Sequence, residues 1–311
     1  MQRAGTPTAP YVAFYSANDA FAWLATQPEN KPWVVKADGN AAGKGVLICD
    51  DRSEAIDAVQ TIMIAREFGT AGDRIIIEER LDGYEVSLLA ICSGTDFLVL
   101  DPAQDYKRIG EADTGLNTGG MGNYSPAPDF SPELIDFTIH QVIIPTLKEV
   151  PFTGVLFVGL IVTAEGPMVL EFNLRFGDPE TQVVLPRLEN DLLDLFDAAI
   201  DGTLTTITPC WSPRKAVTVV LAAGGYPGQY ANGDEIQGLD EASKLPDVLV
   251  FHAGSKAKDG QILTNGGRVL NVTALGDTFA QAIDRSYQAV NKISWPGMTY
   301  RRDIAARVRE H

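Results

Sequence analysis

Short apolar runs separated by tight turns constrain the fold of this chain more than any other feature. Residues 155–162 and 168–172 flank one such turn, and residues 32–37 and 46–49 flank a glycine-rich one. This spacing is typical of strands paired in hairpins. Because helix-length segments lie among the strand pairs, the sequence predicts an α+β or mixed α/β protein. The helices are expected at 18–24, 53–67, 131–148, 192–200 and 278–290, and further strands at 74–79, 85–91, 216–222, 248–252 and 268–274.

The length of 311 residues exceeds one ordinary hydrophobic core and suits two or three domains. The formal net charge of −16 argues against a general nucleic-acid binder, although a local group of cations can still bind a small phosphorylated ligand. Three widely spaced cysteines, Cys49, Cys92 and Cys210, argue against a disulfide framework. With apolar runs far shorter than a membrane span, we expect a cytoplasmic protein that does not contact membranes.

A glycine-rich turn, Gly39–Gly45, follows the first strand of a predicted hairpin; Lys36 stands before the turn and Lys44 stands within it. Its glycines allow backbone amides to approach an anion closely, and Lys44 adds positive charge. The spacing is one residue short of a Walker loop, and Gly45 stands where a hydroxyl would hold Mg²⁺. By itself the turn fits an ordinary surface turn at least as well as a phosphate site.

Polar residues crowd the end of the strand that precedes residue 174. Glu171 and Asn173 share one face of that strand, and their oxygen atoms are ligands suited to Mg²⁺. Downstream, Arg175 can clamp a phosphate or carboxylate, and Asp178 and Glu180 can orient an amine. Glu171 and Asn173 alone would fit a solvated edge strand, but the whole run indicates a site.

Two further segments carry polar groups. Glu78–Leu81 and Glu85 flank a turn whose backbone could meet an adenine edge, or they form a hairpin with charged flanks. Residues 101–128 form a long polar stretch with little periodicity, which predicts a functional or a disordered segment. Within it, Lys107 and Arg108 precede the glycine-rich loop 115–122, which fits either a lid over an anion or a plain flexible loop.

These segments occur in this order in one family. The sequence resembles the phosphoribosylamine–glycine ligases, also called glycinamide ribonucleotide synthetases, which are ATP-grasp enzymes of purine biosynthesis. Residues 175–182 resemble that family's own signature, and the loop 115–122 is nearly as specific. The C-terminal part also matches, at residues 222–228 and 264–269, so that the resemblance covers essentially the whole chain.

The resemblance implies an α+β ATP-grasp fold in which two α+β lobes hold ATP, followed by a small β-rich domain. It places the ATP-grasp domain at 1–205, with a lid lobe at about 12–82 and a core lobe at about 83–205, and the C-terminal domain at 206–311. By position it implies contacts to ATP from Lys36, Gly43, Lys44, Gly45, Glu78, Glu79, Leu81 and Glu85; to Mg²⁺ or Mn²⁺ from Glu171 and Asn173; to the reacting groups from Lys107, Arg108, Arg175 and Asp178; and to the acceptor substrates from Asn117, Thr118, Gly119, Gly120, Met121, Asp178 and Glu180.

The implied reaction needs no nucleophilic side chain. The carboxylate of glycine attacks the γ-phosphate of ATP to give glycyl phosphate, and the amine of phosphoribosylamine then displaces phosphate. Cations and metal neutralise the developing charge while the lobes position the reactants. The expected partners are therefore these small molecules, and we expect a monomer.

The sequence also departs from the family pattern. Relatives carry an N-terminal substrate-binding domain of about 100 residues, an ordinary domain size, which this sequence lacks; we expect its absence to impair activity unless a separate chain complements it. Tyr106, Asn40 and Leu116 stand where His, Leu and Pro are expected. Two alternatives therefore stay open: another ATP-grasp carboxylate–amine ligase, and a nucleotide-binding fragment without ligase turnover.

Overall fold

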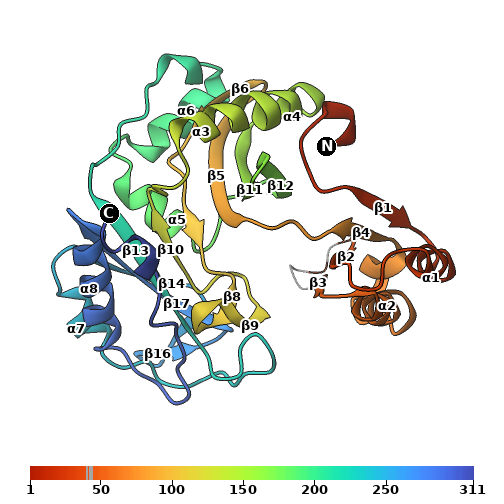
Figure 1. Ribbon diagram of the computed structural model, residues 1–311. Helices are drawn as coiled ribbons and strands as arrows, with labels where there is room; N and C mark the ends of the chain where they lie inside the picture. Colours follow the sequence, from red (N-terminus) through yellow and green to blue (C-terminus); the bar gives the residue numbers. More distant parts are fainter. Residues whose placement is uncertain (40, 42–44) are drawn as a thin grey trace. The chain divides into compact units, whose positions relative to one another are not determined.

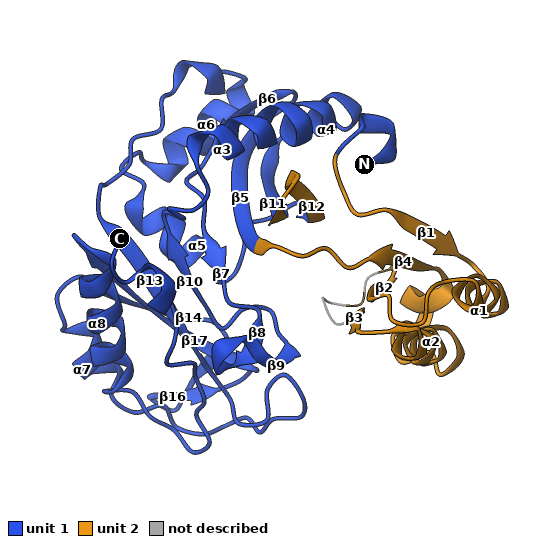
Figure 2. Cartoon of the chain, in the orientation of Figure 1, with its two compact units in different colours: residues 1–6, 85–160, 171–311 blue, residues 7–84, 161–170 orange. Residues whose placement is uncertain are grey.

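The protein divides into two compact units along a chain that crosses between them more than once. A computed structural model describes residues 1–39, 41 and 45–311. Unit 2 comprises residues 7–84 and 161–170, and unit 1 comprises residues 1–6, 85–160 and 171–311 (Figure 2). The predicted boundaries at 82/83 and 205/206 stay predictions, and unit 2 takes in a second segment of chain that the sequence did not indicate.

Unit 2 is a four-stranded antiparallel sheet with two helices. The strand order is β1-β4-β2-β3, and the predicted hairpin is confirmed because Trp33 pairs with Cys49 and Lys36 with Val46. Ser16 caps the first helix through Asp19 N, and Asp51 caps the second through Glu54 N. The elements are β1 (Tyr11–Phe14), α1 (Ala17–Ala25), β2 (Trp33–Ala37), β3 (Val46–Cys49), α2 (Arg52–Val59), the π-helix η2 (Gln60–Ile64), the 3₁₀ helix η3 (Gly69–Asp73) and β4 (Ile75–Glu79).

The core of unit 2 lies on one face of this sheet, under the helices. Val35, Ile75 and Ile77 are fully buried and pack in one cluster with Leu24 of α1 and Val59 of α2. Alternate residues of each strand point to the opposite face, so the side chains of Lys36 and Glu78 point away from this core.

A second sheet, in the order β12-β11-β5-β6, carries the predicted hairpin of residues 155–172. Its strands β11 and β12 pass from unit 1 into unit 2 and back, since residues 161–170, the strand ends with the turn between them, belong to unit 2. In unit 1, Leu89 and Ile91 of β5 pack against Leu195 and Ala199 of α6. The elements are β5 (Tyr84–Ser93), β6 (Asp96–Val99), α3 (Pro132–Thr138), the π-helix η5 (Ile139–Ile143), α4 (Ile144–Glu149), β11 (Gly154–Thr163), β12 (Gly166–Asn173), α5 (Thr181–Val184) and α6 (Leu192–Asp201).

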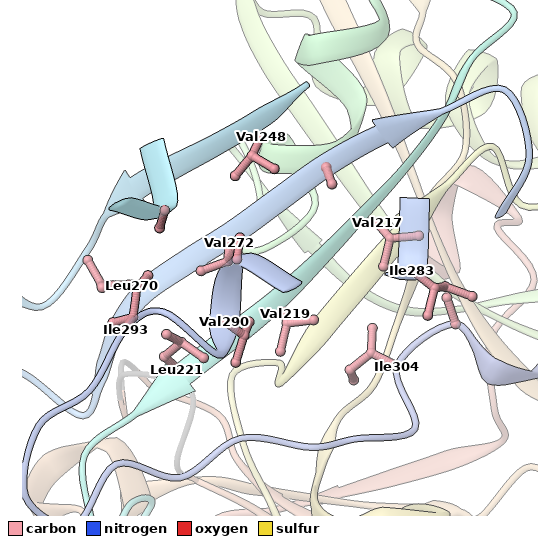
Figure 3. Packing of buried hydrophobic residues seen from close by; sticks show 14 of the residues in the cluster. Val217, Val219, Leu221, Val248, Leu270, Val272, Ile283, Val290, Ile293 and Ile304 are labelled. Atoms are coloured by element: carbon pink, nitrogen blue, oxygen red, sulfur yellow. The ribbon is translucent and has the colours of Figure 1, made fainter. Parts of the chain in front are cut away.

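The third sheet has the order β14-β17-β13-β10-β7 and two chemically different faces. On one face, Val219 and Leu221 of β13 and Val272 of β17 pack with Ile283 and Val290 of helix α8 (Figures 1 and 3). Its elements and neighbours are β7 (Gln104–Asp105), β8 (Arg108–Gly110), β9 (Thr114–Asn117), β10 (Gly122–Ser125), β13 (Lys215–Ala222), α7 (Leu239–Ser243), β14 (Val248–His252), β15 (Ser255–Lys258), β16 (Gln261–Thr264), β17 (Arg268–Gly276) and α8 (Phe279–Val290). The remaining 3₁₀ helices are η1 (Gln2–Ala4), η4 (Glu111–Asp113), η6 (Leu185–Arg187), η7 (Leu204–Thr206) and η8 (Ala306–Val308).

The opposite face of the third sheet carries a row of polar side chains beside apolar ones. Asp105, Asn123, Thr218 and Thr273 lie side by side across four neighbouring strands, as the pairing register requires. The short helix α5 packs over β10, β13 and β17. A polar layer is thus buried between the sheet and α5, at the point where the site described below is built.

Residues 101–128 are ordered, so the disordered alternative for this stretch is wrong. The segment forms four strands of two to four residues, β7 to β10, two of which join the third sheet. Strands of two to four residues are too short to show a usable alternation of apolar and polar side chains, which is why no strand signal is visible in the sequence here.

Burial distinguishes two of the three cysteines from the third. Cys49 and Cys92 are buried, which raises the pKa of each thiol to about 12, whereas Cys210 is exposed; none of them is in a disulfide.

In the described part of the chain, each helix is too short or too polar to cross a bilayer.

Candidate active site

In unit 2, the structure joins Lys36 to Glu78. The Lys36 ammonium lies 2.5 Å from Glu78 Oε1 and donates a hydrogen bond of 3.3 Å to the carbonyl of Leu170. Both side chains are mostly buried, with exposed fractions of 20% for Lys36 and 11% for Glu78. The β2–β4 pairing therefore holds one cation at a fixed place on the face opposite the core.

Glu79 points the other way. As the next residue of the same strand it leaves the opposite face, where its carboxylate lies 2.5 Å from Lys31, which in turn stacks 4.6 Å from the ring centre of Trp33. Leu81 follows in a loop and is half-buried, and Gly45 accepts a hydrogen bond from Ala37 N at 2.8 Å. Gly43 and Lys44, which the sequence assigns to phosphate binding, and the variant position Asn40 lie outside the described residues.

In unit 1, a buried ionic cluster forms around Lys107. The Lys107 ammonium lies 2.5 Å from Asp105 Oδ2 and 3.8 Å from Glu180 Oε1. The side chains of Asp105 and Glu180 are only 2% and 3% exposed. Ser87 of β5 donates a hydrogen bond of 3.1 Å to Glu180 Oε1. The cluster therefore joins residues from three separate segments: β5, β7 and the start of α5. Asp105 and Glu180 pair with Lys107 directly, and Ser87 binds Glu180.

The charges of this cluster do not balance. Burial raises the pKa of Asp105, of Glu180 and of the nearby Glu85, while the positive charge of Lys107 opposes the rise in each case. Burial also disfavours the ammonium of Lys107, but the three carboxylates outweigh it and raise the pKa of Lys107 above its ordinary value. Two buried carboxylates thus share one ammonium, and the half-buried Glu85 adds further negative charge to its surroundings.

Asn123 extends the cluster. It lies directly opposite Asp105 in the β7–β10 register, so the two side chains leave the same face of the sheet. Asn123 is fully buried, and both polar atoms of its amide lack a hydrogen-bond partner among the described residues. Since a buried amide without partners is costly, this position favours a polar group that arrives from outside the chain.

The glycine-rich loop closes over Asp105. A side chain at Gly120, whose φ is 116°, would place its Cβ 2.8 Å from both carboxylate oxygens of Asp105, so that only glycine fits. The hydroxyl and the amide of Thr118 each donate a hydrogen bond of 2.8 Å to the carbonyl of Lys107. Met121 is fully buried in the core, whereas Asn117 is exposed on β9.

The predicted metal pair lies together on β12. Asn173 Nδ2 donates to Glu171 Oε1 at 3.2 Å, and Glu171 is exposed. Among the described residues, no group of three or more His, Cys, Asp or Glu side chains forms a metal site. Two hard oxygen ligands suit Mg²⁺, which keeps several waters and takes phosphate oxygens as further ligands, so the donor set fits this ion.

The remaining predicted residues are held differently. Arg175 is exposed and its guanidinium donates to the carbonyl of Phe176 at 2.8 Å. Arg108 donates to the carbonyl of Gly115 at 2.8 Å. Asp178 accepts from Gln182 at 3.0 Å and pairs with Arg268 at 3.3 Å, so it is not part of the Lys107 cluster.

Sequence reasoning missed three residues of this region: Asp105, Asn123 and Arg268. Asp105 stands two residues before Lys107 and therefore on the same side of the chain, which is a signal that could have identified it. Asn123 and Arg268 give no such local signal, because strand pairing and a contact across 149 residues bring them to the site.

Comparison with known proteins gives consistent matches along most of the chain. Residues 1–181 match the family model described as phosphoribosylglycinamide synthetase, ATP-grasp (A) domain, and residues 216–307 match the C domain of the same synthetase. Phosphoribosylamine–glycine ligase of Rhodopirellula baltica is 47% identical over 317 residues, which cover 98% of this chain and 72% of that protein. The enzyme of the same name from Pseudomonas aeruginosa is 47% identical over 97% of this chain and 71% of its own length.

Solved structures agree with these matches. The crystal structure of phosphoribosylamine–glycine ligase from Thermotoga maritima is similar with a TM-score of 0.84 and 34% identity, over 97% of this chain and 76% of that one. The biotin carboxylase domain of Hydrogenobacter thermophilus 2-oxoglutarate carboxylase, solved with MgADP, has a TM-score of 0.74 at 15% identity, covering 96% of this chain and 65% of that one. The latter likeness concerns the fold alone.

Proposed function

The chain belongs to the phosphoribosylamine–glycine ligase family, and from that premise we propose that it performs the family's reaction with the residues described above. The reaction joins glycine to 5-phosphoribosylamine with the use of ATP and is a step of purine biosynthesis. The predicted family, the α+β ATP-grasp fold and the ATP-dependent ligase activity are confirmed by the matches along the chain. The assignment of roles to single residues is our proposal.

The observation that carries the assignment is the excess of buried negative charge around Lys107. Buried carboxylates without a matching cation are unfavourable, so Asp105 and Glu180, which share the single ammonium of Lys107, favour a second positive group beside it. Among the reactants, glycine brings an ammonium group. We infer that these carboxylates, with the unpartnered amide of Asn123, hold that ammonium and leave the carboxylate of glycine to attack the γ-phosphate.

Lys107 has a second task in this proposal. Asp105 and Glu180 fix its ammonium in place and keep it charged, so it is ready to stabilise negative charge without reorganising. Such charge develops on the phosphoryl group during its transfer and on glycyl phosphate as the amine of phosphoribosylamine displaces phosphate.

On the nucleotide side, we propose that Lys36 binds a phosphate group and that Glu78 fixes the lysine. Support comes from the 2.5 Å ion pair and from the low exposure of both side chains. Glu79 and Leu81 stay predicted contacts of adenine. The contact of Glu85 with ATP also stays a prediction, and its negative charge contributes to the raised pKa of Lys107. Complementation by a separate N-terminal domain and the monomeric state stay predictions.

Glu171 and Asn173 are the proposed ligands of Mg²⁺ or Mn²⁺, which when bound would neutralise phosphate charge. Glu171→Ala is expected to lower kcat by about 100-fold, because it removes the one carboxylate of the pair. The measurement is ADP formation titrated with MgCl₂, with Glu165→Ala on the same hairpin as the matched control. Wild-type magnesium dependence in the Glu171 variant would remove this residue from the metal site.

The experiment that tests the function measures ADP release with ATP, Mg²⁺, glycine and freshly generated phosphoribosylamine, each acceptor being omitted in turn. Release that requires both acceptors, together with glycinamide ribonucleotide detected by mass, is the expected result. ADP release without either acceptor, or with other amines equally well, would favour one of the two alternatives that the sequence leaves open.

A further inference from the structure

One arginine of the C-terminal part holds two segments of the candidate site at once. Arg268 begins β17, and its side chain is 20% exposed. Its Nη1 donates to the carbonyl of Gly119 at 2.5 Å, to that of Gly120 at 3.4 Å and to that of Asp178 at 2.7 Å. Its Nη2 pairs with the Asp178 carboxylate at 3.3 Å. Through these four contacts, the guanidinium group of Arg268 binds both the glycine-rich loop and Asp178.

Tyr226 holds the same loop from another segment. The amide of Gly119 donates to the Tyr226 hydroxyl at 3.1 Å, so both the amide and the carbonyl of Gly119 are bound by C-terminal residues. A Cβ at Gly267 would lie 2.3 Å from the Tyr226 ring, which explains the glycine directly before Arg268. The two contacts thus arise from one compact arrangement of residues 226, 267 and 268.

The loop that these residues hold touches the ionic cluster. A Cβ at Gly120 would meet Pro179 at 2.5 Å and Asp105 at 2.8 Å, which shows how little space separates the three. If the peptide between residues 119 and 120 shifted, it would therefore either clash with Asp105 or leave a gap beside it. Arg268 can influence Asp105 and Lys107 in this way without touching either.

We propose that Arg268 and Tyr226 are positioning residues, which set the glycine-rich loop and Asp178 against the cluster of Asp105, Lys107 and Glu180. The planar fork of arginine suits this task, because it can meet several acceptors in fixed directions whereas lysine cannot. The C-terminal part of the chain thereby takes part in catalysis through the geometry of the loop. The inference rests on the proposed function, since the role of the cluster belongs to it.

The test compares Arg268→Ala, Arg268→Lys and Tyr226→Phe with a matched control, Arg285→Ala. Arg285 also bridges a carbonyl and a carboxylate in unit 1, at 2.6 Å from Leu275 O and 3.0 Å from Asp247, and it contacts neither the loop nor Asp178 in the described set of interactions. Arg268→Ala is expected to lower kcat by about 100-fold, the scale of a displacement near 1 Å in an active site, while KM for ATP stays at the wild-type value.

Rescue and exchange measurements separate positioning from folding. Guanidinium chloride at low millimolar concentration is expected to restore part of the kcat of Arg268→Ala and to leave the wild type and Arg285→Ala unchanged. Arg268→Lys and Tyr226→Phe should lie between wild type and Arg268→Ala. Hydrogen exchange at residues 115–122 should be faster in Arg268→Ala and unchanged in Arg285→Ala.

The proposal is overturned if Arg268→Ala keeps wild-type kcat, if Arg285→Ala loses as much activity, or if exchange in the loop does not change. The exchange experiment needs no turnover. A wild-type protein without ligase activity would therefore refute the proposed function, while the exchange result would still decide whether Arg268 holds the loop.

Discussion

Replacing Lys107 with methionine is expected to lower kcat by about 1000-fold, because the variant removes the one cation of the buried cluster. Methionine has a similar length and cannot donate a hydrogen bond, so the change tests charge rather than bulk. Asp105 and Glu180 would remain buried at 2% and 3% exposure of their side chains without a basic partner. Both kcat and the free energy of unfolding should therefore decrease.

The loss of stability should depend on pH in a defined direction. Without Lys107, burial stays the largest influence on Asp105 and Glu180 and loses its main opposing charge, so it holds their pKa values above those of the unfolded chain despite the hydrogen bonds that each carboxylate accepts. The folded variant then binds protons more tightly than the unfolded one, so its stability falls as the pH rises through and above about 4–5. Urea unfolding should therefore show a larger deficit against wild type at neutral pH than at acid pH.

Lys256→Met, on the exposed hairpin strand β15, serves as the control for both measurements. A surface lysine of this kind is expected to change the free energy of unfolding by less than about 0.5 kcal/mol. If Lys107→Met retained wild-type turnover, the cluster would have no role in the reaction. A stability deficit that did not vary with pH would show that the carboxylates are paired by other groups.

Replacing Arg301 with methionine is expected to lower the free energy of unfolding by about 2 kcal/mol, because it removes a buried guanidinium that binds Asp303 and the carbonyl of Arg108, while the exposed Asp113 can be hydrated instead. Arg301 is 1% exposed and donates to Asp303 at 2.8 and 2.6 Å, to Asp113 at 2.8 Å and to the carbonyl of Arg108 at 3.0 Å. A single side chain thus joins the C-terminal segment to the β8–β9 hairpin.

The neighbouring Arg302 provides the control, since it is exposed and stacks 5.6 Å from the ring of Tyr300. Arg302→Met should unfold at nearly the wild-type urea concentration, whereas the midpoint for Arg301→Met should fall clearly at an unchanged slope. Equal effects of the two changes would contradict the role given to the buried guanidinium.

Tyr106 illustrates what the sequence could and could not indicate. It stands where the family pattern predicts histidine, and the sequence alone indicates no more than this departure. The structure places its ring between two guanidinium groups, 4.8 Å from Arg301 and 4.6 Å from Arg307, and Arg307 donates to its hydroxyl at 3.1 Å. These arginines lie about 200 residues further along the chain, so no local sequence pattern predicts their contact with Tyr106.

The elements that the sequence predicted well share one property: their signals are local. The hairpin of residues 32–49 and the helix expected at 18–24 follow from neighbouring residues. Lys107 and Glu180 were found through motifs that resemble a family. Their meeting with Asp105 and Asn123 depends on strand register and on the packing of α5, which single-sequence patterns do not encode.

The division of unit 2 into two stretches of sequence has a consequence for how the protein is made. Thr8 donates a hydrogen bond to the carbonyl of Val169, its partner at a separation of 161 residues, within the same unit. During synthesis the first stretch leaves the ribosome long before the second, so its sheet must wait without the hairpin turn that completes the unit. Nascent chains that end before residue 161 should therefore expose this unit to chaperones and proteases, and a fragment limited to residues 7–84 would lack part of the unit.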